Sequence, residues 1–279
     1  MRKVLVNGLN LHYQQRGKGS DVILVHGITS NLSRWLLTVL PRLAEHHRVT
    51  AYDLRGHGFS DVPPSGYTSD DLAEELRGLM DGLGIERAHV VGHSFGGAIA
   101  LNGAVRYPER FSSLVVEDSA IPALRWHRSF ENWPLYTRLQ EYLSPHGVKL
   151  PEDPDSWDLS ELLPQLPKFP TLMGLRRGLP LHQRRVQRLT RTTCFEDLRA
   201  VGDLTEERIR SVAVRTLAVY YEHSPFLSIG QYLAEHLPRC RLHVEQGFHL
   251  FPTVAPDAIA EPLLSHFAEV DSDVRSSQP

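Results

Sequence analysis

Short, continuous apolar runs alternate with stretches of helical periodicity along most of the chain. Runs of this length that stop at glycine or polar residues are typical of strands buried on both faces. Regular alternation of strand and helix predicts an α/β fold with a mostly parallel, doubly wound sheet. A hairpin around Asn7-Gly8 adds two strands, which brings the sheet to about eight. The apolar runs stand at residues 21–27, 48–54, 88–94, 111–118, 214–223 and 241–247.

The alternation stops between residues 121 and 209, where prolines are frequent and no strand pattern is found. This interruption predicts a helical cap, residues 121–209, inserted after the sixth strand. Residues 1–120 and 210–270 should then form the α/β core, and 271–279 a flexible tail.

Two features of the expected cap bear on what it could bind. Trp126, Trp133 and Tyr136 are candidates for lining an apolar substrate pocket, although packing of the cap itself is an equally simple role for them. Residues 174–191 are rich in arginine and contain no acidic residue. This stretch is either a solvated face or a docking surface for something acidic, such as a carrier protein or a substrate carboxylate.

Composition limits the classes of function. The chain has 279 residues, 41% of them hydrophobic, which is enough for a packed core, and its net charge of −3 argues against a nucleic-acid partner. Only two cysteines are present, Cys194 and Cys240, which indicates a reducing compartment. No apolar run has the length of a signal peptide or a transmembrane helix, so a cytoplasmic protein with no membrane partner is expected.

The stretch Gly92-His93-Ser94-Phe95-Gly96 matches the pattern G-x-S-x-G and lies between an expected strand and an expected helix. In this context the serine is held on a tight turn, and its neighbours must be small for the turn to close. The N-terminus of the following helix supplies N–H groups that favour a developing oxyanion. The motif therefore predicts that Ser94 is a nucleophile.

With this motif the chain resembles the α/β-hydrolases. The resemblance covers roughly residues 21–118 and 215–267, and includes "VHGITSN", "YDLRGHGFSD" and "GFHLFP". It implies a serine–acid–histidine triad and no cofactor, with His249 as the base. It also implies an oxyanion hole formed by the N–H groups of Ile28 and Phe95.

Other histidines and charged residues near these motifs have simpler roles. His26 is expected to be a structural turn histidine, and Asp53 and Arg55 are expected to hold their loop together. No His, Cys, Asp or Glu spacing indicates a metal site, and His46-His47, at the end of a helix, is expected to be solvated.

The triad acid departs from the usual pattern of this family. The family commonly carries an aspartate just after the seventh strand, where this chain has Ser224, and a serine cannot stabilise an imidazolium as a carboxylate does. Glu222 is one substitute, but it lies about 6.5 Å back along the strand. Asp118, at the end of the sixth strand, is favoured because strand ends converge on the site. Its neighbour Glu117 should face the other side of the sheet. A chain with no functional acid is the third possibility.

A serine nucleophile excludes the branches of this family that use an aspartate nucleophile. The sequence therefore predicts a serine hydrolase that cleaves an ester, lactone or thioester of a mid-sized apolar acyl compound through an acyl-enzyme. Hydrolysis of a carbon–carbon bond in a β-diketone-like substrate is the enzymatic alternative. A small-molecule receptor with a slow or vestigial triad is the alternative from another class.

Overall fold

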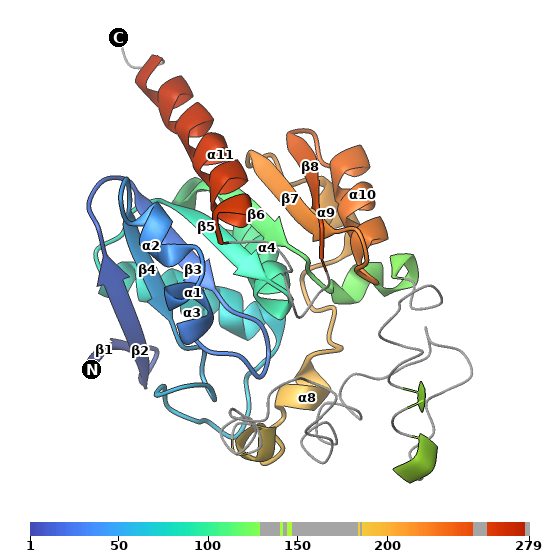
Figure 1. The fold of residues 1–279 in the computed structure, drawn as a ribbon. Coiled ribbons are helices and arrows are strands. Elements are labelled where there is room, and N and C mark those ends of the chain that lie inside the picture. Colours follow the sequence, from blue (N-terminus) through green and yellow to red (C-terminus); the bar gives the residue numbers. More distant parts are fainter. Residues whose placement is uncertain (129–139, 142–143, 147–183, 185, 248–255, 277–279) are drawn as a thin grey trace.

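The computed structural model of the protein describes residues 1–128, 140–141, 144–146, 184, 186–247 and 256–276. Its centre is an eight-stranded sheet in the order β1-β2-β4-β3-β5-β6-β7-β8, in which β1 and β2 are antiparallel to their neighbours and the other strands are parallel (Figure 1). The doubly wound α/β sheet predicted from the sequence is thereby confirmed. The strands are β1 (Arg2–Val6), β2 (Leu9–Arg16), β3 (Asp21–Val25), β4 (Arg48–Tyr52), β5 (Ala88–His93), β6 (Phe111–Glu117), β7 (Thr216–Tyr221) and β8 (Cys240–Glu245).

The predicted hairpin joins β1 to β2. Asn7 and Gly8 both have positive φ angles, 49° and 82°. Such a two-residue turn matches the twist of the paired strands, and asparagine followed by glycine is the pair that adopts it most readily. The register pairs Val6 with Leu9 across the turn.

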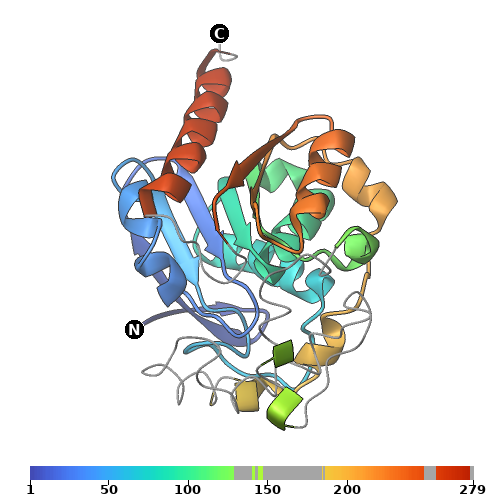
Figure 2. The same ribbon diagram turned by 45° about the vertical axis from the view of Figure 1, so that its right-hand side comes forward.

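Helices cover both faces of the sheet (Figure 2). One face packs against α3 (Ser69–Gly82), α4 (Phe95–Arg106) and α10 (Leu227–His236), and the other against α1 (Ser33–Leu36), α2 (Leu40–Leu43) and α11 (Pro256–Ser276). Side chains of a strand alternate between these faces: in β3, Ile23 faces the first group and Val22 and Leu24 face the second. In the described part of the chain, no helix is both long enough and apolar enough to span a membrane.

The described residues between 121 and 209 contain short helices and no strand. They include the 3₁₀ segments Pro122–His127 and Ser144–His146, together with α8 (Cys194–Asp197) and α9 (Glu206–Arg210). A small apolar cluster joins this region to the core, because Val186 and Leu189 are buried together with Tyr67 of the core.

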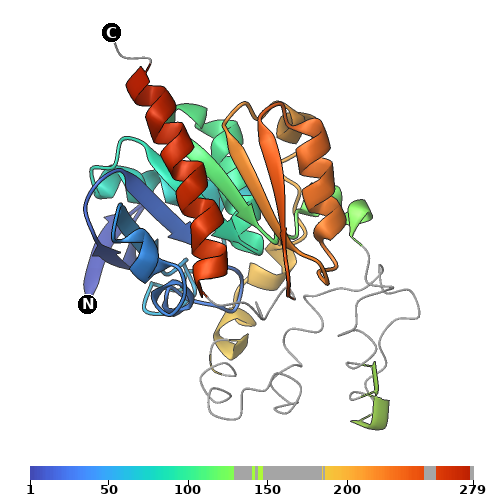
Figure 3. The same ribbon diagram turned by 45° about the horizontal axis from the view of Figure 1, so that its top comes forward.

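The prediction of a flexible tail at residues 271–279 is wrong for residues 271–276, because α11 continues to Ser276 (Figure 3). Asp271 anchors this part of the helix. One carboxylate oxygen accepts a hydrogen bond from Ser20 Oγ at 2.9 Å, and the other lies 3.1 Å from His89 Nε2. A polar sequence that suggested a loose end is therefore held to the starts of β3 and β5.

His47 belongs to the same cluster, so the expectation that His46-His47 is solvated is wrong for the second residue. His47 is 6% exposed. Its Nδ1 lies 2.9 Å from Ser20 Oγ, and its ring meets that of Phe267 edge to face. Because Ser20 donates its only hydrogen to Asp271, Nδ1 of His47 must be the donor to Ser20. Burial lowers the pKa of His47 and keeps the ring neutral.

His266 on α11 leads to a prediction about stability in acid. The side chain is fully buried, and neither ring nitrogen has a hydrogen-bond partner among the described residues. Burial, reinforced by the charge of Arg241, lowers the pKa of His266 to about 4. Because the unfolded chain binds the proton more readily, stability is lost as the pH falls from about 6.5 towards 4, at about 1.4 kcal/mol per pH unit.

His266→Leu removes this titration. Between pH 7 and pH 5 the variant should lose about 2 kcal/mol less of its free energy of unfolding than the wild type. Urea denaturation at the two pH values measures the difference. His46→Leu is the control, because the His46 side chain is exposed. Equal losses in His266→Leu and the wild type would contradict the prediction.

Candidate active site

Ser94 lies on the turn between β5 and α4, as the motif predicts. Its backbone has φ 55° and ψ −126°, a conformation that costs energy for a residue with a side chain. The surroundings stabilise it: Ser94 N donates to Glu117 O at 2.9 Å, and Ser94 O accepts from Ser119 Oγ at 2.6 Å. The strained residue is thereby fixed between β6 and the start of α4.

The glycines around Ser94 are required by close backbone contacts. A Cβ atom at Gly92 would lie 2.1 Å from Gly96 O, and one at Gly96 would lie 2.3 Å from Val25 O. The expectation that the flanking positions of the motif, two residues before and after the nucleophile, must be small is confirmed. Gly27 brings a second loop to the serine, since a Cβ there would stand 2.8 Å from the Cβ and 3.3 Å from the Oγ of Ser94.

The loop that follows β3 is held by the expected residues. His26 is fully buried; its Nε2 accepts from Leu54 N at 3.1 Å, so its Nδ1–H donates to Gly27 O at 2.8 Å. This confirms His26 as a turn histidine. Asp53 accepts from Leu32 N at 2.8 Å and from Phe59 N at 3.0 Å.

The loop roles expected for Asp53 and Arg55 are also confirmed. Burial alone would raise the pKa of Asp53, but the backbone N–H donors and the hydrogen bond with the His12 ring outweigh it and hold the pKa below its usual range. Arg55 Nε donates to Glu75 at 2.7 Å, and both side chains are shielded from solvent.

His57 is a positioning residue that the sequence analysis missed. Its Nδ1–H donates to Arg55 O at 2.8 Å, and its Nε2 accepts from Thr29 N at 3.2 Å. Burial lowers the pKa of His57 to about 3, so Nε2 stays an acceptor at neutral pH. Thr29 needs such support because its φ is 60°. The isolated histidine between two glycines in "RGHG" was the signal in the sequence.

Arg188 of the arginine-rich stretch has a structural partner. Its guanidinium donates to Gly56 O at 3.0 Å and to Gly58 O at 3.1 Å, on either side of His57. At this position the stretch is therefore not simply a solvated face, because it holds the loop that contains His57.

The two N–H groups expected in the oxyanion hole stand on the two elements that meet at Ser94. Phe95 is the first residue of α4, where the helix leaves backbone N–H groups without an internal partner. Ile28 follows Gly27, whose backbone approaches the Ser94 side chain. The positions suit the role, which stays a prediction.

The two candidate acids differ sharply in their surroundings. Asp118 is fully buried directly after β6, with φ 45° and its N–H donating to Val219 O at 2.7 Å. The Glu222 side chain is 45% exposed and lies 3.2 Å from His223 Nε2. Ser224 N donates to Tyr221 O at 3.0 Å, which closes the turn expected at this corner. His249 lies outside the described residues, so its contact with Asp118 stays a prediction.

Glu117 faces the opposite side from the nucleophile turn, as expected, and forms a cluster that the sequence did not predict. One carboxylate oxygen accepts from Arg34 Nη2 at 2.8 Å and from Tyr221 OH at 2.9 Å, with Glu117 only 1% exposed. Burial, together with the charge of Glu117, raises the pKa of Tyr221, which therefore stays a donor. Since Glu117 O also accepts from Ser94 N, one residue links α1, β7 and the nucleophile turn.

Arg34→Ala should lower the free energy of unfolding by about 2–3 kcal/mol, because it leaves the Glu117 carboxylate buried with a single donor. The loss is smaller than for a fully buried pair because the Arg34 side chain is 16% exposed. Arg42→Ala is the matched control: its partners Glu45 and Asp257 are exposed, and less than about 1 kcal/mol should be lost. Urea denaturation gives both values, and equal losses would contradict the prediction.

The described residues do not bury Trp126, one of the three candidates for lining an apolar pocket, and that role stays a prediction. The residue is 80% exposed on a short 3₁₀ segment. The Arg125 guanidinium lies over its ring, 4.5 Å from the centroid, in a cation–π contact at the surface. Trp133 and Tyr136, the other two pocket candidates, lie outside the described residues.

Comparison with known proteins gives concordant matches. Residues 22–146 match the model of the family described as alpha/beta hydrolase fold. A 2-hydroxy-6-oxo-2,4-heptadienoate hydrolase of Pseudomonas putida is 38% identical over 118 residues, which cover 41% of this chain and 43% of that relative. The match therefore spans less than half of the relative's own length.

Two solved structures match nearly the whole chain. The enol-lactonase from Burkholderia xenovorans LB400 has a TM-score of 0.70 at 21% identity, covering 96% of this chain and 100% of its own. The meta-cleavage product hydrolase from Pseudomonas fluorescens IP01 has a TM-score of 0.67 at 24% identity, covering 96% and 98%. At these identities the likeness is one of fold.

Proposed function

This chain belongs to the α/β-hydrolase fold superfamily, and on that premise we propose that it is a serine hydrolase acting through an acyl-enzyme. Its substrate is an ester, lactone or thioester of a mid-sized apolar acyl compound. The observation that carries the proposal is the Ser94 turn: a strained serine, fixed by Glu117 and Ser119, with the Gly27 backbone beside its Oγ.

In the proposed reaction Ser94 Oγ attacks the substrate carbonyl while His249 accepts the hydroxyl proton. The negative charge on the tetrahedral intermediate is stabilised by the N–H groups of Ile28 and Phe95. His249 then returns the proton to the leaving alcohol or thiol and the acyl group stays on Ser94. The alcohol or thiol of an ester or thioester departs, whereas the hydroxyl of an opened lactone remains part of the acyl group. Water, deprotonated by His249, attacks the acyl-enzyme and releases the carboxylic acid and the free serine.

Asp118 is the proposed acid of the triad. A carboxylate that accepts from the histidine fixes its tautomer and stabilises the imidazolium formed during the reaction. Burial of Asp118 beside the nucleophile strand supports this role. The exposure of Glu222 and its pairing with His223 argue against Glu222.

Hydrolysis of a carbon–carbon bond is the second candidate. The relative from Pseudomonas putida that is 38% identical carries the name 2-hydroxy-6-oxo-2,4-heptadienoate hydrolase, and a second relative is named 2-hydroxymuconate semialdehyde hydrolase. The same serine and histidine support either reaction, since both begin at a carbonyl group.

A substrate screen tests the proposal. Wild-type protein is assayed with p-nitrophenyl esters, thioesters and lactones of graded acyl length, and with 2-hydroxy-6-oxo-2,4-heptadienoate. Faster turnover of a mid-length ester, thioester or lactone than of the shortest member of its series supports the first candidate. Preference for the carbon–carbon substrate selects the second. No turnover of any substrate, by a protein that unfolds cooperatively, would overturn both.

A further inference from the structure

A cavity of about 290 Å³ lies at the end of the sheet opposite to Ser94. Most of its lining residues precede or begin strands, and two belong to α11. Arg87 stands directly before β5, and Ser94 directly follows the same strand. The six residues of β5 therefore separate it from the candidate active site by roughly 20 Å. No part of the proposed reaction uses this cavity.

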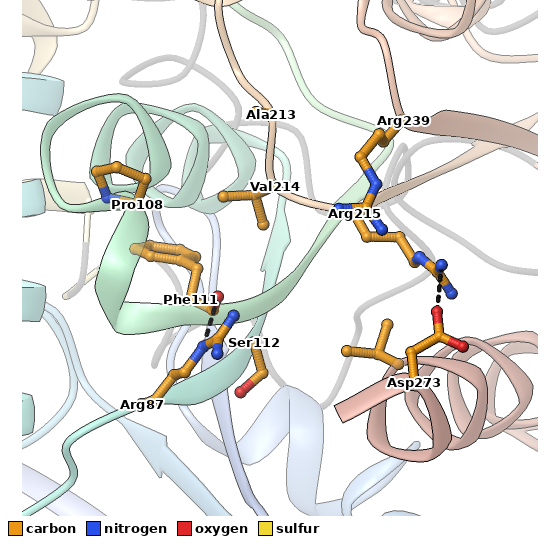
Figure 4. A pocket seen from close by; sticks show the side chains of 10 residues that line it. Arg87, Pro108, Phe111, Ser112, Ala213, Val214, Arg215, Arg239 and Asp273 are labelled. Carbon is orange, nitrogen blue, oxygen red and sulfur yellow. Dashed lines mark hydrogen bonds and ion pairs between the residues drawn. The ribbon is translucent and has the colours of Figure 1, made fainter. Parts of the chain in front are cut away.

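The cavity has an apolar wall. Phe111, at the start of β6, and Val270, on α11, line it and are otherwise buried, with 2% and 6% exposure. Val214, in the segment before β7, adds a third apolar side chain (Figure 4). An apolar wall beside a few charged groups is the usual composition of a site for a small organic molecule.

The charged groups are predominantly basic. Arg87, Arg215 and Arg239 come from three different segments, and Asp273 is the one acidic residue in the lining. Arg215 pairs with Asp273 at 2.5 Å. In the described part of the chain, no ion pair involves Arg87 or Arg239. The cavity therefore carries an excess of positive charge.

The guanidinium of Arg87 is held in place by the protein itself. Its Nε donates to Phe111 O at 3.0 Å, which fixes the plane of the group beside the apolar wall (Figure 4). A guanidinium that is already oriented loses less side-chain entropy when it binds an anion. Its remaining N–H groups suit a carboxylate, which the planar fork can bind through two hydrogen bonds.

We propose that this cavity is a second ligand site, which binds a small organic monocarboxylate that has an apolar body. The carboxylate contacts Arg87 and Arg239, and the apolar body packs against Phe111 and Val214. Inorganic phosphate has no apolar body to pack against Phe111 and Val214, so it should bind more weakly than an organic monocarboxylate. The proposal does not depend on the proposed hydrolase activity.

Benzoate is the probe, with benzyl alcohol as the neutral molecule of similar shape and inorganic phosphate as the dianion. Amide chemical shifts of ¹⁵N-labelled protein are followed at constant ionic strength. Benzoate should bind saturably in the millimolar range and shift the amides of Val214 and Val270. Arg87→Gln and Arg239→Gln should each weaken binding about tenfold, because each removes a charge-assisted hydrogen bond. Benzyl alcohol and phosphate should bind more weakly than benzoate.

Arg241→Gln is the matched control. This arginine lies on β8, pairs with Glu269 and does not line the cavity, so its replacement should leave benzoate binding unchanged. Equal weakening in the Arg241 and Arg239 variants would overturn the proposal, as that result would reflect general surface charge. So would the absence of saturable binding, benzoate-induced shifts confined to the residues around Ser94, or phosphate binding as tight as that of benzoate.

Discussion

Ser94→Ala should lower kcat by about 10⁴–10⁶, the loss expected when the nucleophile of a triad is removed. Alanine at φ 55° is as strained as serine, so the free energy of unfolding should change by less than about 1 kcal/mol. The large kinetic effect and the small thermodynamic one together separate a catalytic role from a structural one.

A fluorophosphonate probe gives an independent test. It should label the wild type once, on the peptide that contains Ser94, and leave Ser94→Ala unlabelled. Ser65→Ala is the control, since Ser65 lies on the surface, and it should react like the wild type. Labelling that persists in the Ser94 variant would refute the assignment.

Asp118→Asn should lower kcat by about 10²–10⁴, because an amide cannot stabilise the imidazolium and favours the wrong tautomer. Glu222→Gln should cost less than about tenfold, since its carboxylate points to solvent and pairs with His223. Steady-state kinetics on one ester substrate measures both variants. Thermal unfolding of each variant separates loss of function from loss of fold.

The assignment of Asp118 as the triad acid also predicts a contact between Asp118 and His249. A carboxylate oxygen of Asp118 should lie about 2.6–3.2 Å from Nδ1 of His249 in an experimental structure. If Glu222 occupies that place, or if Glu222→Gln shows the greater loss, the acid lies at the corner after β7 and the assignment to Asp118 is wrong.

The parts of the molecule that the sequence predicted are those governed by local rules. Asn7-Gly8 forms its hairpin because both residues tolerate positive φ. The Ser94 turn is recognisable because Gly92 and Gly96 stand at fixed offsets where no Cβ fits. The choice of Asp118 over Glu222 rests on a general rule, the convergence of neighbouring strand ends, and stays a prediction.

The parts that the sequence did not predict depend on contacts between distant segments. Arg34 and Glu117 are 83 positions apart, and His89 and Asp271 are 182 apart. Periodicity indicates which face of an element is buried, but it does not identify the side chain on the other segment that it meets. For the same reason the polar end of α11 resembled a tail until its partners Ser20 and His89 were known.

Because α11 covers one face of the sheet, that face cannot be fully buried until the end of α11 has been synthesised. The strands carrying Val22, Leu24 and Val91 are made early, whereas Ile259 and Phe267, which pack on the same face, are made much later. Until α11 leaves the ribosome, only α1 and α2 can cover that apolar face, and the part beneath α11 remains exposed. Nascent chains that have not reached residue 259 therefore expose it to chaperones and to other unfinished chains, and aggregation is expected from this face first.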